Sequence, residues 1–134
     1  MIWNTLVFDM RPMGKGVAQF AGHAFTPAKT REYMTELGLM AREQFQLDPY
    51  TGPLCVKIAC VFPTQKKERW GTWHFIKPDA DNIEKALFDA LKGIVWRDDC
   101  LIADHRTTKH WGPEACITVT FYELELTEKE KRIP

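Results

Sequence analysis

The stretch Lys77–Asp99, which reads KPDADNIEKALFDALKGIVWRDD, sets five aspartates, one glutamate and three lysines around a single apolar stripe. On a helix that turns 100° per residue, six apolar side chains fall on one face, as in an amphipathic helix that packs on a core. These are Ile83, Ala86, Leu87, Ala90, Leu91 and Ile94. The stretch therefore predicts a helix from about Asp81 to Lys92 that ends at Gly93.

The charged side of this predicted helix has two interpretations. Asp81, Lys85 and Asp89 recur at every fourth residue, and on a solvated face such pairs contribute only ~0.2–0.5 kcal/mol each. Asp81 also stands three residues before Glu84, which is the spacing of a capping box. For Asp81 alone, we favour the helix cap.

Aspartates gather at both ends of the predicted helix, and this weakens the solvated-face interpretation. Asp79 and Asp81 lie two residues apart in an extended lead-in, so that both carboxylates can point the same way. Asp98 and Asp99 follow a turn after the helix. If the next strand returns beside the helix N-terminus, three or four acids converge there, and they must share a proton or a cation.

A divalent cation is the expected partner of such a cluster. Carboxylate oxygens suit magnesium or manganese, which hold waters and bridge to phosphates. Lys85, one turn after Asp81, would then hold a phosphate or offset charge in the transition state. The pattern predicts metal-assisted cleavage of a phosphodiester bond.

Size and composition bound the rest of the chain. The 134 residues suit one domain, residues 1–134, with a charged tail from about Thr127. Eighteen basic residues balance eighteen acidic ones and the pI is about 6.9, so any surface for nucleic acid is local. The four cysteines have no zinc-site spacing, and we expect buried, reduced thiols. The sequence shows neither a signal peptide nor a membrane span, so we expect a cytoplasmic protein.

The remaining segments predict a small α/β (α+β) domain. Four segments read as strands: Thr5–Met10, Leu54–Phe62, Cys100–His110 and Glu114–Leu126. The last two are separated by a Trp-Gly-Pro turn, residues 111–113, which suggests a hairpin. A second helix is expected over 26–45, with Thr26 as N-cap and Pro27 at the first helical position. We expect a mixed β-sheet with both main helices packed on one face.

The segment from Lys77 to His110 resembles the RusA-type Holliday junction resolvases of bacteria and prophages. The shared pattern is D-x-D-N-x-x-K-x-x-x-D-A-L followed by D-D. The resemblance implies a RusA-like α/β homodimer that cuts four-way DNA junctions symmetrically with magnesium. It also implies catalytic acids at Asp79, Asp81 and Asp99, metal ligation by these three and Asp98, and an essential lysine at Lys85.

Two features depart from the resemblance. The family usually has a glutamine two residues after the aspartate pair, where this chain has Leu101, so any polar contact of that glutamine is lost. The neutral net charge is also lower than the basic character of the family.

Six cations are the candidate DNA-binding residues. They are Lys66, Lys67, Arg69, Lys77, Arg106 and Lys109. The first three precede Trp70 and Trp73 in a loop that either grips phosphates and stacks on an unpaired base, or is simply solvated with half-buried tryptophans. The histidines at 74, 105 and 110 fit no zinc pattern, and we assign them to the surface or to DNA contact.

Three functions remain open at this point: a junction endonuclease, a junction-binding protein without turnover, and a metal-stabilised structural domain. Phe88 is expected on the polar side of the helix, covered by a partner subunit or by the adjoining strand. Two symmetric cuts require two-fold symmetry, which a homodimer supplies.

Overall fold

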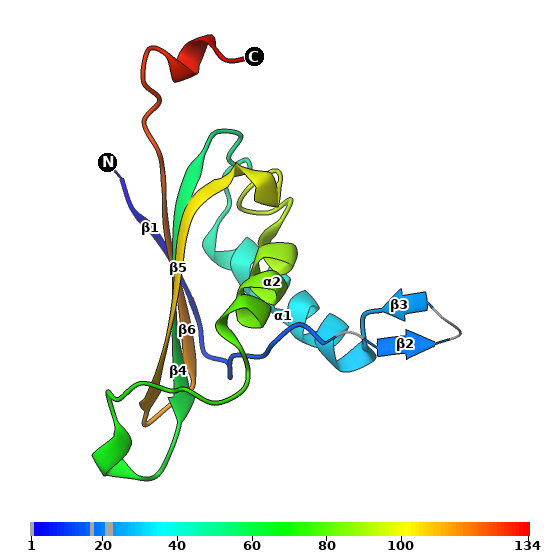
Figure 1. Ribbon diagram of the computed structural model, residues 1–134, viewed down its shortest axis with the longest axis vertical. Helices are drawn as coiled ribbons and strands as arrows, with labels where there is room; N and C mark the ends of the chain where they lie inside the picture. Colours follow the sequence, from blue (N-terminus) through cyan, green and yellow to red (C-terminus); the bar gives the residue numbers. More distant parts are fainter. Residues whose placement is uncertain (1, 17, 21–22) are drawn as a thin grey trace.

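The computed structural model describes residues 2–16, 18–20 and 23–134, and in it the main sheet is covered on one face by two helices (Figure 1). The strands are β1 (Asn4–Phe8), β2 (Ala18–Phe20), β3 (His23–Phe25), β4 (Leu54–Pro63), β5 (Ile102–Gly112) and β6 (Cys116–Glu123). The helices are α1 (Ala28–Gln44) and α2 (Ala80–Leu91), with short 3-10 turns η1 (Lys67–Arg69), η2 (Asp99–Leu101) and η3 (Glu130–Arg132).

The main sheet is mixed and has the order β1-β6-β4-β5. β4 pairs in parallel with β5 and antiparallel with β6, while β1 pairs antiparallel with β6. β2 and β3 form a separate two-stranded ribbon that projects beyond the start of α1 (Figure 1). The predicted α+β class, with a mixed sheet and two main helices, is confirmed.

The hairpin expected around residues 111–113 is wrong. β5 and β6 lie on opposite sides of β4 and do not pair with each other. β4 is the apolar central strand and pairs with β5 along one edge and with β6 along the other. The short turn after β5 therefore connects two strands that are not neighbours in the sheet. The parallel pairing of β4 with β5 requires a crossover between them, and α2 provides it.

The core lies between β4 and the two helices. Val56, Ile58, Cys60 and Phe62 of β4 are at most 2% exposed, and Lys57 on the opposite face of the strand is exposed. One face of this strand is therefore buried in the core. The apolar stripe predicted for residues 83–94 is confirmed, because all of its members are buried, including Ile94 just beyond the end of α2.

Both helices begin at residues other than those expected. α1 begins at Ala28, with Pro27 and not Thr26 at the N-cap position. α2 begins at Ala80, because the carbonyl of Asp79 accepts the first helical hydrogen bond from Ile83 N at 3.1 Å. Asp81 therefore lies inside the first turn, and its interpretation as a capping box with Glu84 is wrong.

The cysteines form no disulfide. Cys55 and Cys60 are buried, as expected, whereas Cys116 is only half-buried and Cys100 is exposed. Burial raises the pKa of the Cys60 thiol to about 12, so this group stays protonated inside the core. Among the described residues, no helix has the length and apolarity needed to cross a bilayer.

Candidate active site

The N-terminal end of α2 presents the first group of predicted acids to solvent. Asp79 occupies the N-cap position without capping, and its Oδ1 lies 2.9 Å from Lys77 Nζ. Asp81 Oδ2 lies 3.8 Å from Lys85 Nζ, and both of these side chains are more than 60% exposed. Two carboxylates and two ammonium groups therefore alternate on a surface that is open to a substrate.

The C-terminal end of α2 carries the second group in a more enclosed setting. Asp99 Oδ1 accepts a hydrogen bond from the indole of the buried Trp96 at 2.9 Å. Burial raises the pKa of the Asp99 carboxyl; the Trp96 hydrogen bond opposes the shift and nearby Asp89 adds to it. Asp89 itself is held by Lys15, whose Nζ lies 2.5 Å from its Oδ2.

Asp98 has a local structural contact at this end. Its side chain accepts a hydrogen bond from Cys100 N at 3.2 Å and so caps η2. This bond, together with the charge of Lys92, lowers the pKa of the Asp98 carboxyl. The adjacent Leu101 is half-buried against the core, which is consistent with an apolar residue there.

The two groups of acids do not converge within one chain. In the part of the chain that the structure describes, no three acidic, histidine or cysteine side chains lie together as metal ligands would. Asp81 and Asp89 are eight helical residues apart, which is about 12 Å along the axis. β5 does return beside the N-terminus of α2, but Asp98 and Asp99 precede this strand and stay at its starting end.

The carboxylates at the exposed N-terminal end of α2 are nevertheless suitable ligands for magnesium. Magnesium keeps several waters and is commonly held by one or two carboxylates together with substrate phosphates. Asp79 and Asp81 supply two such carboxylates, both more than 45% exposed. The donor set at the N-terminus of α2 therefore suits this ion.

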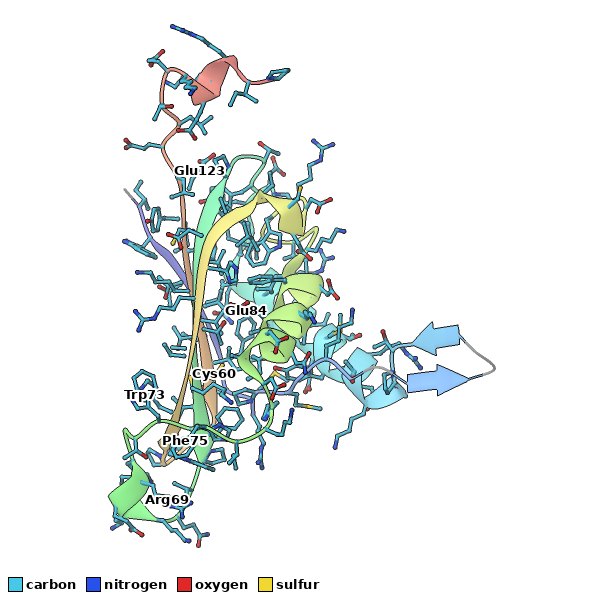
Figure 2. All side chains as sticks on the ribbon, in the orientation of Figure 1. Cys60, Arg69, Trp73, Phe75, Glu84 and Glu123 are labelled. Atoms are coloured by element: carbon cyan, nitrogen blue, oxygen red, sulfur yellow. The ribbon has the colours of Figure 1, made fainter. Side chains whose placement is uncertain are left out.

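A residue that sequence reasoning missed fixes α2 against the sheet. Glu84 projects from α2 toward β5 (Figure 2), where its Oε2 accepts a hydrogen bond from Thr107 Oγ1 at 2.5 Å and lies 2.9 Å from His105 Nδ1. The Glu84 side chain is 13% exposed. Residues two apart on a strand share a face, so the reading of residues 100–110 as a strand already places His105 and Thr107 together, and this is the signal in the sequence that could have indicated the contact.

The cations of the loop before α2 lie at its two ends. Lys77 is exposed beside Asp79 at the start of α2, whereas Lys66, Lys67 and Arg69 are exposed in and beside η1 at the other end of the loop. Lys109, at the far end of β5, instead donates hydrogen bonds to the carbonyls of Ile76 at 2.8 Å and Pro78 at 2.7 Å. Lys109 therefore ties the approach to Asp79 onto the sheet.

Arg106 lies away from the acids of α2 and from the cations of the loop before it. It pairs in register with Lys57 on the sheet face that the helices leave open. There it lines a shallow hollow whose other residues are Lys57, Ile58, Ala59, Thr108, Thr118 and Thr120. The structure thus places Arg106 on the sheet face opposite the one that α2 and its acids cover.

His74 and Phe88 are packing groups. His74 is 4% exposed and stacks on Phe62 at 3.8 Å between ring centroids, so its assignment to the surface is wrong. Phe88 packs edge-on against Trp96 and His105 at 5.8 and 6.0 Å, which supports coverage by the chain's own strand.

These features define a class: small α+β domains whose solvent-facing helix carries acids and a lysine next to a loop rich in cations and aromatic side chains. Within that class, residues 9–122 match the family model described as "Endodeoxyribonuclease RusA". Because the match covers most of the sequence, the chain belongs to the RusA endodeoxyribonuclease family.

A relative in Bacillus subtilis (strain 168) has also been found, named as the uncharacterized protein YqaN. It is 25% identical over 134 residues, which span 92% of this chain and 94% of the relative. The similarity therefore extends over nearly the whole length of both proteins.

Proposed function

We propose that this chain is a magnesium-dependent endodeoxyribonuclease that resolves four-way DNA junctions by symmetric cleavage. The observation that carries the proposal is the N-terminal end of α2, where Asp79, Asp81 and Lys85 are exposed together beside a cationic loop. Membership of the RusA family supports the nuclease class and junction binding. We also propose a cytoplasmic location, where the DNA of a bacterium or prophage lies.

In this proposal, Asp79 and Asp81 would hold a magnesium ion, which would supply polarisation of the phosphoryl oxygen and activation of a water as the nucleophile. Lys77 and Lys85 each lie beside one of these carboxylates, and their ammonium groups are free to turn toward a phosphate. The amides at the N-terminus of α2 favour an anion in the same place, because the helix dipole is positive there.

We further propose that the active form is a homodimer. A two-fold axis that passes beside α2 near Lys85, at right angles to the helix, would set each end of this helix against the opposite end of the partner helix. The acids at Asp98 and Asp99 in one copy would then approach Asp79 and Asp81 in the other. Two such composite sites arise at once, as two symmetric cuts require.

A cleavage assay tests the proposed function. The purified chain is incubated with a labelled four-way junction or a duplex of the same sequence, with magnesium or with EDTA. We expect symmetric cuts in the junction only with magnesium, and little cutting of the duplex. Tight junction binding without any cleavage would contradict the nuclease and favour a binding protein. A large gain in melting temperature with magnesium, again without cleavage, would favour a structural metal.

A further inference from the structure

The loop between β4 and α2 holds four large apolar side chains in solvent. Trp70 is 40% exposed, Trp73 59%, Phe75 88% and Ile76 61%. Solvent-exposed apolar groups that gather in one place commonly mark a binding site. Trp73, Phe75 and Arg69 of this loop lie at one end of the molecule (Figure 2).

The loop is anchored to the sheet through its backbone. Gly71 N donates to Trp111 O at 2.9 Å, and Trp111 N donates back to Thr72 O at 2.9 Å. His74 N donates to Lys109 O at 3.0 Å. Trp73 stacks on His110 with ring centroids 4.2 Å apart. The loop backbone and the Trp73 ring are therefore held in place before any partner arrives, which lowers the entropy cost of binding.

Two adjoining hollows run along this loop. The first, which we call the aromatic hollow, has a volume of about 450 Å³ and is lined by Arg69, Thr72, Trp73, Phe75, Ile76 and Trp111. The second, of about 640 Å³, shares Phe75 and Ile76 with the first and reaches Lys77, Asp79 and Lys109. Because Phe75 and Ile76 separate the two hollows, a group bound in the aromatic hollow would lie next to the hollow that Asp79 lines.

We propose that the aromatic hollow binds one unstacked nucleobase of the DNA strand whose phosphate lies at Asp79. Aromatic side chains bind single bases by stacking on their faces, without regard to sequence. The charges match this occupant: Arg69 lies 6.0 Å from the Trp111 ring, and Lys66, Lys67 and Lys77 are exposed nearby. Cations around an apolar hollow complement a base attached to phosphates.

This inference rests on the proposed function and explains how the site would select its substrate. In a duplex the bases are stacked, and extracting one costs a few kcal/mol. At the branch point of a junction, stacking is already interrupted, so a base enters the hollow at lower cost. Base binding would therefore favour branched DNA over duplex before any bond is cut.

Phe75→Ala tests the inference, with binding measured in EDTA so that cleavage plays no part. Junction affinity should fall about 5- to 100-fold, the range expected for one stacked base. Duplex affinity and the salt dependence of binding should stay the same, because no cation is removed. Phe75→Tyr should restore junction affinity, because it keeps the ring.

Leu39→Ala is the matched control, because Leu39 is an exposed apolar residue on α1, 59% exposed. It should leave both affinities unchanged. Equal losses for junction and duplex with Phe75→Ala, or no loss at all, would overturn the inference. So would a change from dimer to monomer in sedimentation, since the hollow would then be an interface between copies. A wild-type chain that discriminates junction from duplex through Phe75 but never cleaves would refute the proposed function alone.

Discussion

The two ends of α2 carry the same chemical groups in opposite settings. At the N-terminal end, Asp79 and Asp81 are exposed and each lies beside a lysine. At the C-terminal end, Asp99 is bonded to a buried indole and its pKa is raised by burial. An open, cation-lined end suits substrate and metal, whereas an enclosed end orients one carboxylate at a cost in stability. The contrast shows that aspartates close in sequence have different roles when they flank one helix.

The largest expected effect comes from removing a carboxylate at the exposed end. Asp81→Asn keeps the shape of the side chain but removes a metal ligand, so junction cleavage should fall at least ~100-fold. Binding without metal should hold or rise slightly, because one negative charge near DNA is lost. Cleavage rates and EDTA binding measure the two effects. Glu43→Gln, an exposed acid on α1, is the control, and an unchanged rate for Asp81→Asn would mean that this end is only solvated.

A similar but smaller loss is expected at Lys85. Lys85→Ala removes the ammonium group that would offset charge as the phosphodiester reacts, so cleavage should fall ~100-fold. Binding should change only modestly, because a single phosphate contact is lost. Single-turnover rates at saturating enzyme separate these effects. A loss confined to affinity would show that Lys85 serves binding and not chemistry.

The pH dependence of stability should differ between the two ends, beginning with His74 beside the exposed end. Burial, followed by the charge of Lys109, lowers the pKa of the His74 imidazole. The unfolded chain thus binds the proton more tightly, and stability is lost as pH falls below about 6.5. His74→Phe should flatten the fall in melting temperature between pH 7.5 and 5.5. An unchanged pH profile would contradict this assignment.

At the enclosed end of α2, the change of stability with pH should have the opposite sign, and it should be the smallest of these effects. Because the pKa of Asp99 is raised, its stability contribution falls as pH rises above about 3.9, the ordinary Asp value. Asp99→Asn should therefore raise the melting temperature at pH 7.5, and the gain should shrink toward pH 4.5. Asp98→Asn is the contrasting control and should lower it at neutral pH, because the pKa of Asp98 is lowered. Equal responses would contradict the difference between the two carboxylates.

The helix α2 and the α+β class could be predicted from the sequence, because local periodicity decides both. The apolar spacing of Ile83, Leu87 and Leu91 and the alternation of residues 54–62 each specify a buried face, and both are confirmed. Strand pairing could not be found in this way. Residues 102–112 and 116–123 have similar alternation, and nothing local shows that β4 separates them.

The expected convergence of acids failed for a related reason. The sequence suggested that the strand after Asp99 returns beside the N-terminus of α2, and it does. However, the residue that arrives there is Lys109, at the far end of β5, while Asp99 remains where the strand begins. Local patterns identify the chemical groups, but they do not show at which end of the 11-residue strand β5 each group lies.

Mixing two inactive variants tests the central claim that the ends of α2 act together across a homodimer. Asp81→Asn and Asp99→Asn chains with different tags are co-expressed, and the doubly tagged dimer is isolated. Each variant alone should fail to cut a four-way junction in magnesium. In the mixed dimer, one composite site carries both changes and the other carries neither, so the account predicts recovered cutting of one strand. A mixed dimer as inactive as its parents, beside an active wild type, would contradict the account.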